Sequence, residues 1–504
     1  MNGDLLQGFY LALAPTSILA TALGALHGLI CGMMPGLTTS AGIIILFPVT
    51  FILEPTTAVA LLLGVFAGGM TGGSFAAILI NIPGSPSASA TTMDGFPLTQ
   101  KGEAGRALGV SIVSSFTGGL FSFFCLLLIA PQLTKVALQF RAADLFGLVF
   151  FGMSVISAFA AKSLVKGLLS TFLGLMIVTV GMDPLVGTAR FTFGDVNMLA
   201  GIHFIPALVG LFAIPEIVAN LAEGNIRSVA SRFGRVFPSW ADIKKIRLPV
   251  AIGSMVGTFV GILPGAGGPI AVFVSYDYAQ KVNKEPEQFG KGCVEGVAAP
   301  ESANSSIAGG ALIPMMTLGI PGDPITAILI GALLVHGMAP GPLLFVEQGP
   351  FAFSVLFSYF IAICSTATVA FLGLRVIVKL LSIPRSLLLP IIVALCVLGT
   401  YALRNSFFDI YVMFFFGLVA LSFKWLDIPV VPMLLALVLG RQLEEHLRVA
   451  LAASKGDISI FFTSPWCLFF LCLSVISFAW PFFLEWRVKK RALEKASASA
   501  PSSP

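Results

Sequence analysis

Apolar runs follow one another along almost the entire chain. They lie at about 17–34, 38–53, 57–80, 107–130, 143–160, 167–182, 203–222, 250–263, 267–281, 295–320, 325–339, 349–374, 386–403, 409–423, 429–441 and 464–484. Only 11% of the 504 residues are charged, whereas about 25% is usual in a soluble domain. A bilayer admits only helices or closed barrels, and these runs are too long and too uniformly apolar for barrel strands. We therefore expect an all-α polytopic membrane protein in contact with a lipid bilayer.

Several runs are too short for a full crossing or are interrupted by Pro-Gly. A helix that spans the hydrocarbon core needs about 20 residues, and Pro inside a helix removes a backbone donor. The interruptions indicate broken helices or re-entrant hairpins, which are tolerated at membrane depth where protein buries them.

Two Pro-Gly motifs occur twice, in the same order. The first is GMMPG at 32–36 and GILPG at 261–265, an offset of 229 residues; the second is IPGSP at 82–86 and IPGDP at 320–324, an offset of 238. Matches in the same order at similar offsets favour a duplication, although one Pro-Gly match alone would carry little weight. We predict two structural repeats.

The positions of the basic residues favour inverted repeats over parallel ones. No Lys or Arg precedes Lys101, whereas basic residues concentrate in the linker after 222 and again after Trp486. Basic loops stay in the cytoplasm, and parallel repeats would carry the basic tail outside. Inverted repeats avoid this conflict and predict a periplasmic N-terminus and a cytoplasmic C-terminus. The basic residues that this arrangement leaves on the wrong side are Lys135, Arg141, Arg190 and Arg404.

The repeats and the charges together predict five segments. These are a first membrane repeat at 1–222, a basic cytoplasmic linker at 223–249, a second membrane repeat at 250–445, a C-terminal transmembrane helix at 446–490 and a disordered cytoplasmic tail at 491–504. The tail ends in ASASAPSSP, which offers nothing to bury in a core.

The helix breaks are the candidate substrate site. Unpaired N–H groups at a broken helix, with nearby hydroxyls, can hold an anion without a fixed positive charge. The alternatives are an ordinary polar loop at the second motif and a simple helix cap at Thr38. The candidate substrate ligands in the first half are Pro35, Gly36, Thr38, Asn81, Pro83, Gly84, Ser85 and Ser87. Those in the second half are Pro264, Gly265, Gly267, Pro321, Gly322 and Asp323.

A cation site is a second hypothesis. Small and polar residues in the second half offer carbonyl and hydroxyl ligands, and Asn304, Ser305 and Thr317 are the candidate Na⁺ ligands. Glu301 and Asp323 are the acidic candidates there, because intramembrane carboxylates are costly and usually functional. Either carboxylate could instead lie in a wet loop.

Several function classes lack their signatures. The chain has no Walker A loop and no GxSxG motif accompanied by a plausible triad, and its charge pattern is not that of a nucleic-acid-binding protein. We expect no enzymatic activity and no nucleic-acid partner. The remaining enzymatic alternative is an intramembrane hydrolase that pairs Asp94 with Asp323 or uses a serine, which requires two groups within hydrogen-bond reach.

At these motifs the chain resembles the large membrane subunit of the tripartite tricarboxylate transporter family. The resemblance covers nearly the whole length, through GMMPGLTTSAG at 32–42, the segment 72–109, GILPGAGGPI at 261–270 and the segment 292–342. Where the family pattern implies two adjacent asparagines, this chain has Asn304 and Ser305.

The resemblance implies secondary uptake of citrate-like or other carboxylates across a bacterial inner membrane. It also implies coupling to Na⁺ or H⁺ with no other cofactor, and an elevator or rocking movement. The implied partners are a small membrane subunit of four helices and a periplasmic substrate-binding protein. A carboxylate channel or exporter that is not coupled to an ion gradient is the alternative.

Overall fold

The computed structural model describes residues 2–34, 37–159, 163–183, 186–222, 234–265, 267–380 and 385–479. Several of the predictions fall wholly or partly outside these residues. Pro35 and Gly36 are not among them, and neither are residues 223–233 of the expected linker. The same holds for the end of the expected C-terminal helix and the whole expected tail, from 480 onward.

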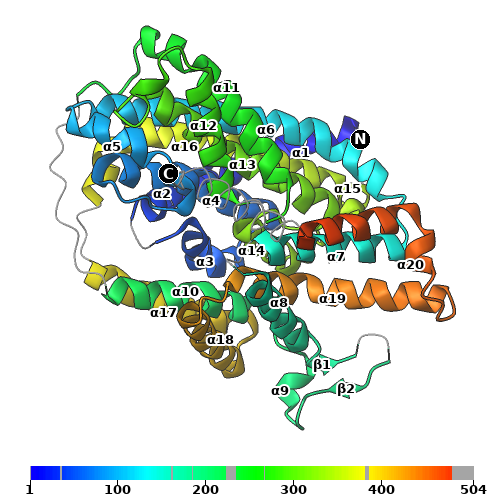
Figure 1. The fold of residues 1–504 in the computed structure, drawn as a ribbon. Helices are drawn as coiled ribbons and strands as arrows, with labels where there is room; N and C mark the ends of the chain where they lie inside the picture. Colours follow the sequence, from blue (N-terminus) through cyan, green and yellow to red (C-terminus); the bar gives the residue numbers. More distant parts are fainter. Residues whose placement is uncertain are drawn as a thin grey trace, which may run out of the picture. The chain divides into compact units, whose positions relative to one another are not determined.

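The described chain is almost entirely helical (Figure 1). Six of its helices are long and apolar enough to cross a membrane. The strands in the described part are β1 (Gly181–Met182) and β2 (Ala189–Arg190), which form one short antiparallel pair. The prediction of an all-α polytopic membrane protein is confirmed, and the inverted repeats stay a prediction.

The chain divides into two compact units, each made of two stretches of sequence. Unit 1 comprises Met1–Gln139 and Ile202–Ser422, and unit 2 comprises Phe140–Gly201 and Phe423–Pro504. Unit 1 contains α1 (Asn2–Ala12), α2 (Pro15–Met33), α3 (Thr39–Thr50), α4 (Pro55–Ile80), η1 (Pro86–Ala88), α5 (Thr92–Gln100), α6 (Ala104–Ala137), α10 (Phe204–Ala222), α11 (Trp240–Ile262), α12 (Gly268–Val282), η2 (Pro286–Gln288), α13 (Val294–Leu318), α14 (Pro324–Val335), α15 (Pro342–Glu347), α16 (Gly349–Leu380), α17 (Arg385–Arg404) and most of α18 (Phe407–Trp425).

Close helix packing through small residues occurs twice in unit 1. Gly24, Gly28 and Gly32 on α2 lie against the backbone of α4, where a Cβ atom would come within 2.1 to 2.3 Å of a carbonyl oxygen. The glycines 229 positions later, at 253, 257 and 261 on α11, lie against α13 in the same way. Such four-residue spacing of glycines lets two helix backbones approach closely in a membrane. The close glycine packing of α2 on α4 therefore recurs in α11 on α13, 229 residues later, which is also the offset between GMMPG and GILPG.

An apolar core surrounds these helix pairs in unit 1. It includes Phe75 and Ile78 on α4, Leu108 on α6 and Val297 on α13, all of which are fully buried. Because these side chains leave little free volume, the helix ends that carry the Pro-Gly motifs are held by packed neighbours.

Unit 2 combines α7 (Ala142–Phe159), α8 (Leu164–Val178), α9 (Val196–Leu199), α19 (Val430–Ala453), α20 (Ile460–Thr463) and the helix Pro465–Ala479. The Asp144 carboxylate accepts hydrogen bonds from the Ser464 hydroxyl and from the Cys467 N–H, the latter at 3.1 Å. Arg190 on β2 pairs with Glu444 on α19 at 2.6 Å, and this hydrogen-bonded carboxylate raises the pKa of the Arg190 guanidinium. α19 continues through the expected boundary at 445–446.

Candidate functional site

The repeated motifs lie where helices of unit 1 end. α2 ends at Met33 and α3 begins at Thr39; α11 ends at Ile262 and α12 begins at Gly268. α4 ends at Asn81, which has a left-handed backbone (φ 58°), and α13 ends at Gly319, with φ 70°. A helix therefore ends at each of the four Pro-Gly motifs, as the sequence predicts.

The two motifs of each half contact one another through glycine. A Cβ atom on Gly84 would lie 1.9 Å from the Gly32 carbonyl oxygen, and the Gly84 N–H donates to the Gly73 carbonyl at 3.1 Å. A Cβ atom on Gly322 would lie 2.9 Å from the Gly261 carbonyl oxygen. In each half, the glycine of the IPG motif therefore packs against the first glycine of the other motif, Gly84 against Gly32 and Gly322 against Gly261.

The break in α13 also touches the break in α11. The Gly265 N–H donates to the Gly322 carbonyl at 3.0 Å. Pro264 and Pro321 are buried beside this bond. These four candidate residues form one packed junction.

The first break meets the start of α12. A Cβ atom on Gly268 would lie 2.6 Å from Ser87 Cβ, and the Ser85 and Ser87 hydroxyl oxygens are 3.0 Å apart. Gly267, with φ 75°, precedes α12 and has no side chain that could cap it. The first-turn N–H groups of α12 therefore lie near two hydroxyls, which are the donor types that a carboxylate needs. The two halves contact one another here, and we call this place the serine–α12 junction (Ser85, Ser87, Gly267 and Gly268).

The starts of α3 and α14 already carry carboxylates from this chain. Thr38 donates to Glu216 on α10 through its N–H and also through its hydroxyl, the latter at 3.1 Å. Asp323 caps its own helix, because its Oδ1 accepts from the Thr326 N–H at 2.7 Å. A helix start that is satisfied by an internal carboxylate is a poorer place for a substrate anion than the serine–α12 junction.

The other candidates of the first break lie at its edge. Asn81 is exposed, and Pro83 is half-buried. Glu216 lies inside α10, and its partner Thr38 is 178 residues away in the sequence, so no local sequence pattern indicates their contact.

A second polar cluster lies at Glu301, in the N-terminal part of α13. This carboxylate is fully buried and accepts hydrogen bonds from the hydroxyls of Thr91, Ser111 (3.1 Å) and Ser115 (3.3 Å). Charge-assisted hydrogen bonds of this kind stabilise a buried carboxylate. The cluster joins α13 to α6 and to the segment just before α5.

The structure places two of the three expected cation ligands together, Asn304 and Ser305, and the third, Thr317, apart from them. The Asn304 Nδ2 donates to the Met70 carbonyl at 2.9 Å, whereas the Asn304 Oδ1 and the Ser305 hydroxyl are buried without a hydrogen-bond partner. Thr317 lies three turns further along α13, and its hydroxyl donates to the Ile313 carbonyl of its own helix at 2.7 Å. Asn304 and Ser305 adjoin the Glu301 turn, and Thr317 does not.

Asp94 on α5, the acid named in the hydrolase alternative, holds several surrounding segments together. Its carboxylate accepts from the Tyr276 hydroxyl (2.7 Å) and from the N–H groups of Gly290 (3.0 Å), Gly292 (2.7 Å) and Cys293 (2.9 Å). Among the described residues, the partners of Asp94 differ from those of Asp323, which caps α14, so the structure does not pair these two carboxylates as the hydrolase alternative requires.

The chain matches one family model and two known proteins. The sequence model of the tripartite tricarboxylate transporter TctA family matches residues 18–435. A protein described as an uncharacterized 52.8 kDa protein in the TAR-I ttuC′ 3′ region of Agrobacterium vitis is 38% identical over 468 residues, 92% of each chain. An uncharacterized protein in the TAR-II ttuC′ 3′ region of the same organism is 38% identical over 212 residues, 42% of this chain and 86% of the relative. No solved structure matches the chain. The chain belongs to the tripartite tricarboxylate transporter TctA family.

Proposed function

We propose that this chain is the large transmembrane subunit of a binding-protein-dependent secondary transporter that takes up tricarboxylates or related carboxylates. Its family is one of transporters, which supports a transport role rather than catalysis. The driving force in this proposal is a gradient of Na⁺ or H⁺ across a bacterial inner membrane. The observation that carries it is the serine–α12 junction, where helix breaks from both halves meet.

The chemistry of the junction suits a carboxylate substrate. None of the four Pro-Gly motifs contains Lys or Arg. An anion there would be held by backbone N–H groups, by the Ser85 and Ser87 hydroxyls and by the positive end of the α12 dipole. A cation bound with it would offset the remaining charge of a di- or trianion, which gives a physical reason for coupling.

The junction also suits alternating access. Ser85 and Ser87 belong to the first half and Gly268 to the second, so both halves contribute to one site, as in transporters built from inverted repeats. In this account the N-terminus is periplasmic and the C-terminus is cytoplasmic. The broken regions of the two halves move together against the remaining helices, in an elevator or rocking motion.

Two partners complete the transporter in this proposal. A small membrane subunit of four helices accompanies the chain in the bilayer, and a periplasmic binding protein delivers the carboxylate. The family description, which names a tripartite transporter, supports both partners.

Uptake into proteoliposomes tests the proposal. The chain, its small subunit and its binding protein are reconstituted, and uptake of labelled citrate is measured with an imposed Na⁺ gradient, an imposed pH gradient or neither. Accumulation against the citrate gradient with only one of the imposed gradients is expected, and it names the coupling ion. Equilibration that depends on neither gradient would replace the proposal with a carboxylate channel or an uncoupled exporter.

A further inference from the structure

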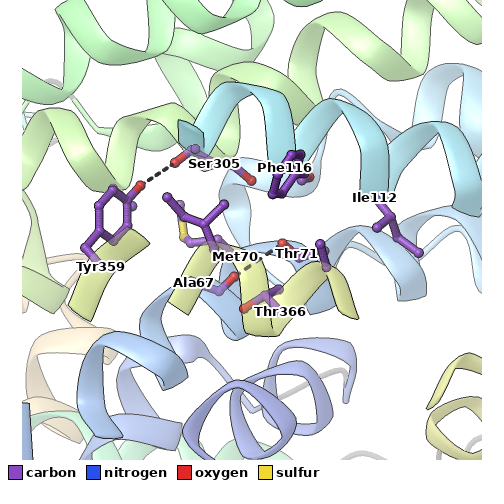
Figure 2. A pocket seen from close by; sticks show the side chains of 13 residues that line it. Ala67, Met70, Thr71, Ile112, Phe116, Ser305, Tyr359 and Thr366 are labelled. Carbon is purple, nitrogen blue, oxygen red and sulfur yellow. Dashed lines mark hydrogen bonds between the residues drawn. The ribbon is translucent and has the colours of Figure 1, made fainter. Parts of the chain in front are cut away.

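A small cavity lies inside unit 1, between α4, α6, α13 and α16 (Figure 2). Its volume is about 20 Å³, which is room for one water molecule, and most of its lining is apolar. This cavity is too small for an organic ligand. A more open place with uncompensated charge lies on the surface of α11.

α11 has a packed face and an exposed face. The packed face carries the glycines that lie against α13. The exposed residues of the other face follow one another at intervals of three or four positions, with Arg247 beside Leu248: Trp240, Lys244, Leu248, Ala251, Met255 and Phe259. This spacing places side chains on one side of a helix, so they form one continuous exposed stripe.

The apolar part of the stripe indicates where the lipid chains lie. Leu248, Met255 and Phe259 are each more than half exposed, on a helix that is long and apolar enough to cross a membrane. Large apolar side chains on the outside of such a helix face hydrocarbon. Lys244 precedes Leu248 by one turn, about 6 Å along the helix axis. The basic end of the stripe therefore lies at the level where lipid chains give way to headgroups.

The positive charges at this end have no acidic partner in the part of the chain that the structure describes. Lys244 and Arg247 are exposed and belong to no ion pair there. The nearby acid, Asp242, is buried; it accepts from Arg106 Nε on α6 at 3.1 Å and from the Ser239 hydroxyl at 2.7 Å. Two like charges three positions apart on a helix repel one another, so an anion from outside would stabilise this end.

Trp240 is a further feature of a headgroup site. Its side chain is 74% exposed, and its ring N–H forms no hydrogen bond with the described residues. Tryptophan is enriched where a membrane meets water, because its ring is apolar and its N–H is a donor. We call Trp240, Lys244 and Arg247 the α11 interfacial patch.

We propose that the α11 interfacial patch binds the phosphate group of an anionic phospholipid, whose acyl chains lie along the apolar stripe from Leu248 to Phe259. Lysine and arginine next to a membrane-crossing helix attract anionic lipids, and the guanidinium of Arg247 can donate to two phosphate oxygens. An apolar helix of another protein could cover the stripe but would leave both positive charges unpaired. A phospholipid satisfies the charged end and the apolar stripe together.

Lipid binding to the purified full chain tests the patch. The detergent-solubilised protein is titrated with phosphatidylglycerol or with phosphatidylcholine of the same acyl chains, and native mass spectrometry measures the Kd of the first bound lipid. We expect phosphatidylglycerol to bind more tightly. The double variant Lys244→Gln with Arg247→Gln is expected to weaken its binding at least about tenfold and to leave phosphatidylcholine binding unchanged. Lys244→Arg, which keeps the charge, is expected to bind as the wild type does.

Lys284→Gln with Lys291→Gln is the control. It removes the same charge from two exposed lysines on either side of η2, where Glu285 and Glu287 are close in the sequence. This variant is expected to retain phosphatidylglycerol binding. Equal loss of binding in the control and in the patch variant would overturn the assignment to α11.

Three other results would also overturn the proposal. The first is equal affinity of the wild type for the two lipids, and the second is displacement of phosphatidylglycerol by millimolar inorganic phosphate, which would indicate a site for the free ion. The third is loss of phosphatidylglycerol binding when the small membrane subunit is present, which would make the stripe an interface between subunits.

Discussion

Gly84 lies directly against the backbone of Gly32, so that a Cβ atom at position 84 would come within 1.9 Å of the Gly32 carbonyl oxygen. The two Pro-Gly motifs of the first half are therefore in backbone contact. Gly322 and Gly261 form the corresponding contact in the second half. It is looser, because a Cβ atom on Gly322 would lie 2.9 Å from the Gly261 carbonyl oxygen. If the helix breaks move, the two glycines of each contact have to move together.

Gly84→Ala is expected to destabilise the protein more than Gly322→Ala. The atom that a new methyl group meets at Gly84 is a backbone oxygen, which cannot rotate away as a flexible side chain can. Overpacking of this kind costs about 1–3 kcal/mol of folding free energy. Thermal unfolding of the detergent-solubilised protein measures the difference. Gly234→Ala is the control, because no heavy atom lies within 4 Å of its Cβ position. Equal melting temperatures for Gly84→Ala and Gly234→Ala would contradict the packing.

This contact also changes how a bulkier substitution is interpreted. The sequence alone suggests that Gly84→Leu fills an anion cradle and abolishes uptake while leaving membrane expression intact. Since the Gly84 Cβ position is occupied by backbone, the same variant is expected to reduce expression as well. Substitutions at Gly84 therefore test helix packing, and substitutions at Ser85 and Ser87 test substrate binding.

Glu216→Ala is expected to destabilise α3, and Glu216→Gln to do so less. The Glu216 carboxylate accepts from the N–H and the hydroxyl of Thr38, and the glutamine carbonyl can keep one of these bonds. Loss of a cap costs about 0.5–2 kcal/mol. Glu54→Gln is the matched control, since Glu54 is exposed and makes no side-chain cap at the start of α4. If thermal unfolding shows the same midpoint for Glu216→Ala and Glu54→Gln, the cap is not important.

Asp94→Asn is expected to lower the melting temperature more than Tyr276→Phe. An asparagine NH₂ group would face backbone N–H donors that now bind a carboxylate oxygen, whereas phenylalanine removes only one donor. An unsatisfied buried group costs about 1–3 kcal/mol. Asp277→Asn, at an exposed pair with Lys281, serves as the control and is expected to change stability by less than about 1 kcal/mol. A larger effect of Tyr276→Phe than of Asp94→Asn would show that the carboxylate is not the anchor.

The class of fold and the helix breaks could be predicted from sequence, but the partners of the polar residues could not. Pro-Gly motifs end helices for local reasons of backbone geometry, so the ends near Asn81 and Gly319 follow from the residues themselves. Glu216 and Glu301 owe their roles to Thr38 and Thr91, 178 and 210 residues away, and no local pattern encodes such pairs. The sequence indicated the breaks that carry the candidate site, but the contact between Ser87 and Gly268 follows only from the fold.

The inverted arrangement predicts the accessibility of two positions. In a background without native cysteines, a cysteine at Ser228 in the linker is expected to react with a membrane-impermeant maleimide only from the cytoplasmic side. A cysteine at Gly3, where the structure leaves open space, is expected to react only from the periplasmic side. Labelling of intact cells and of inside-out vesicles measures both. Reaction of both positions from the same side would contradict inverted halves.

The most direct measurement is gradient-driven citrate uptake by a variant that lacks both serine hydroxyls, Ser85→Ala with Ser87→Ala. Each hydrogen bond to a charged group is worth about 1.5–3 kcal/mol, so we expect at least about a tenfold loss of apparent affinity. Ser275→Ala is the control, because its buried hydroxyl bonds only to helix carbonyls, of Val272 and Ala299, and uptake should persist. Wild-type affinity in the double serine variant would contradict a carboxylate site at the serine–α12 junction.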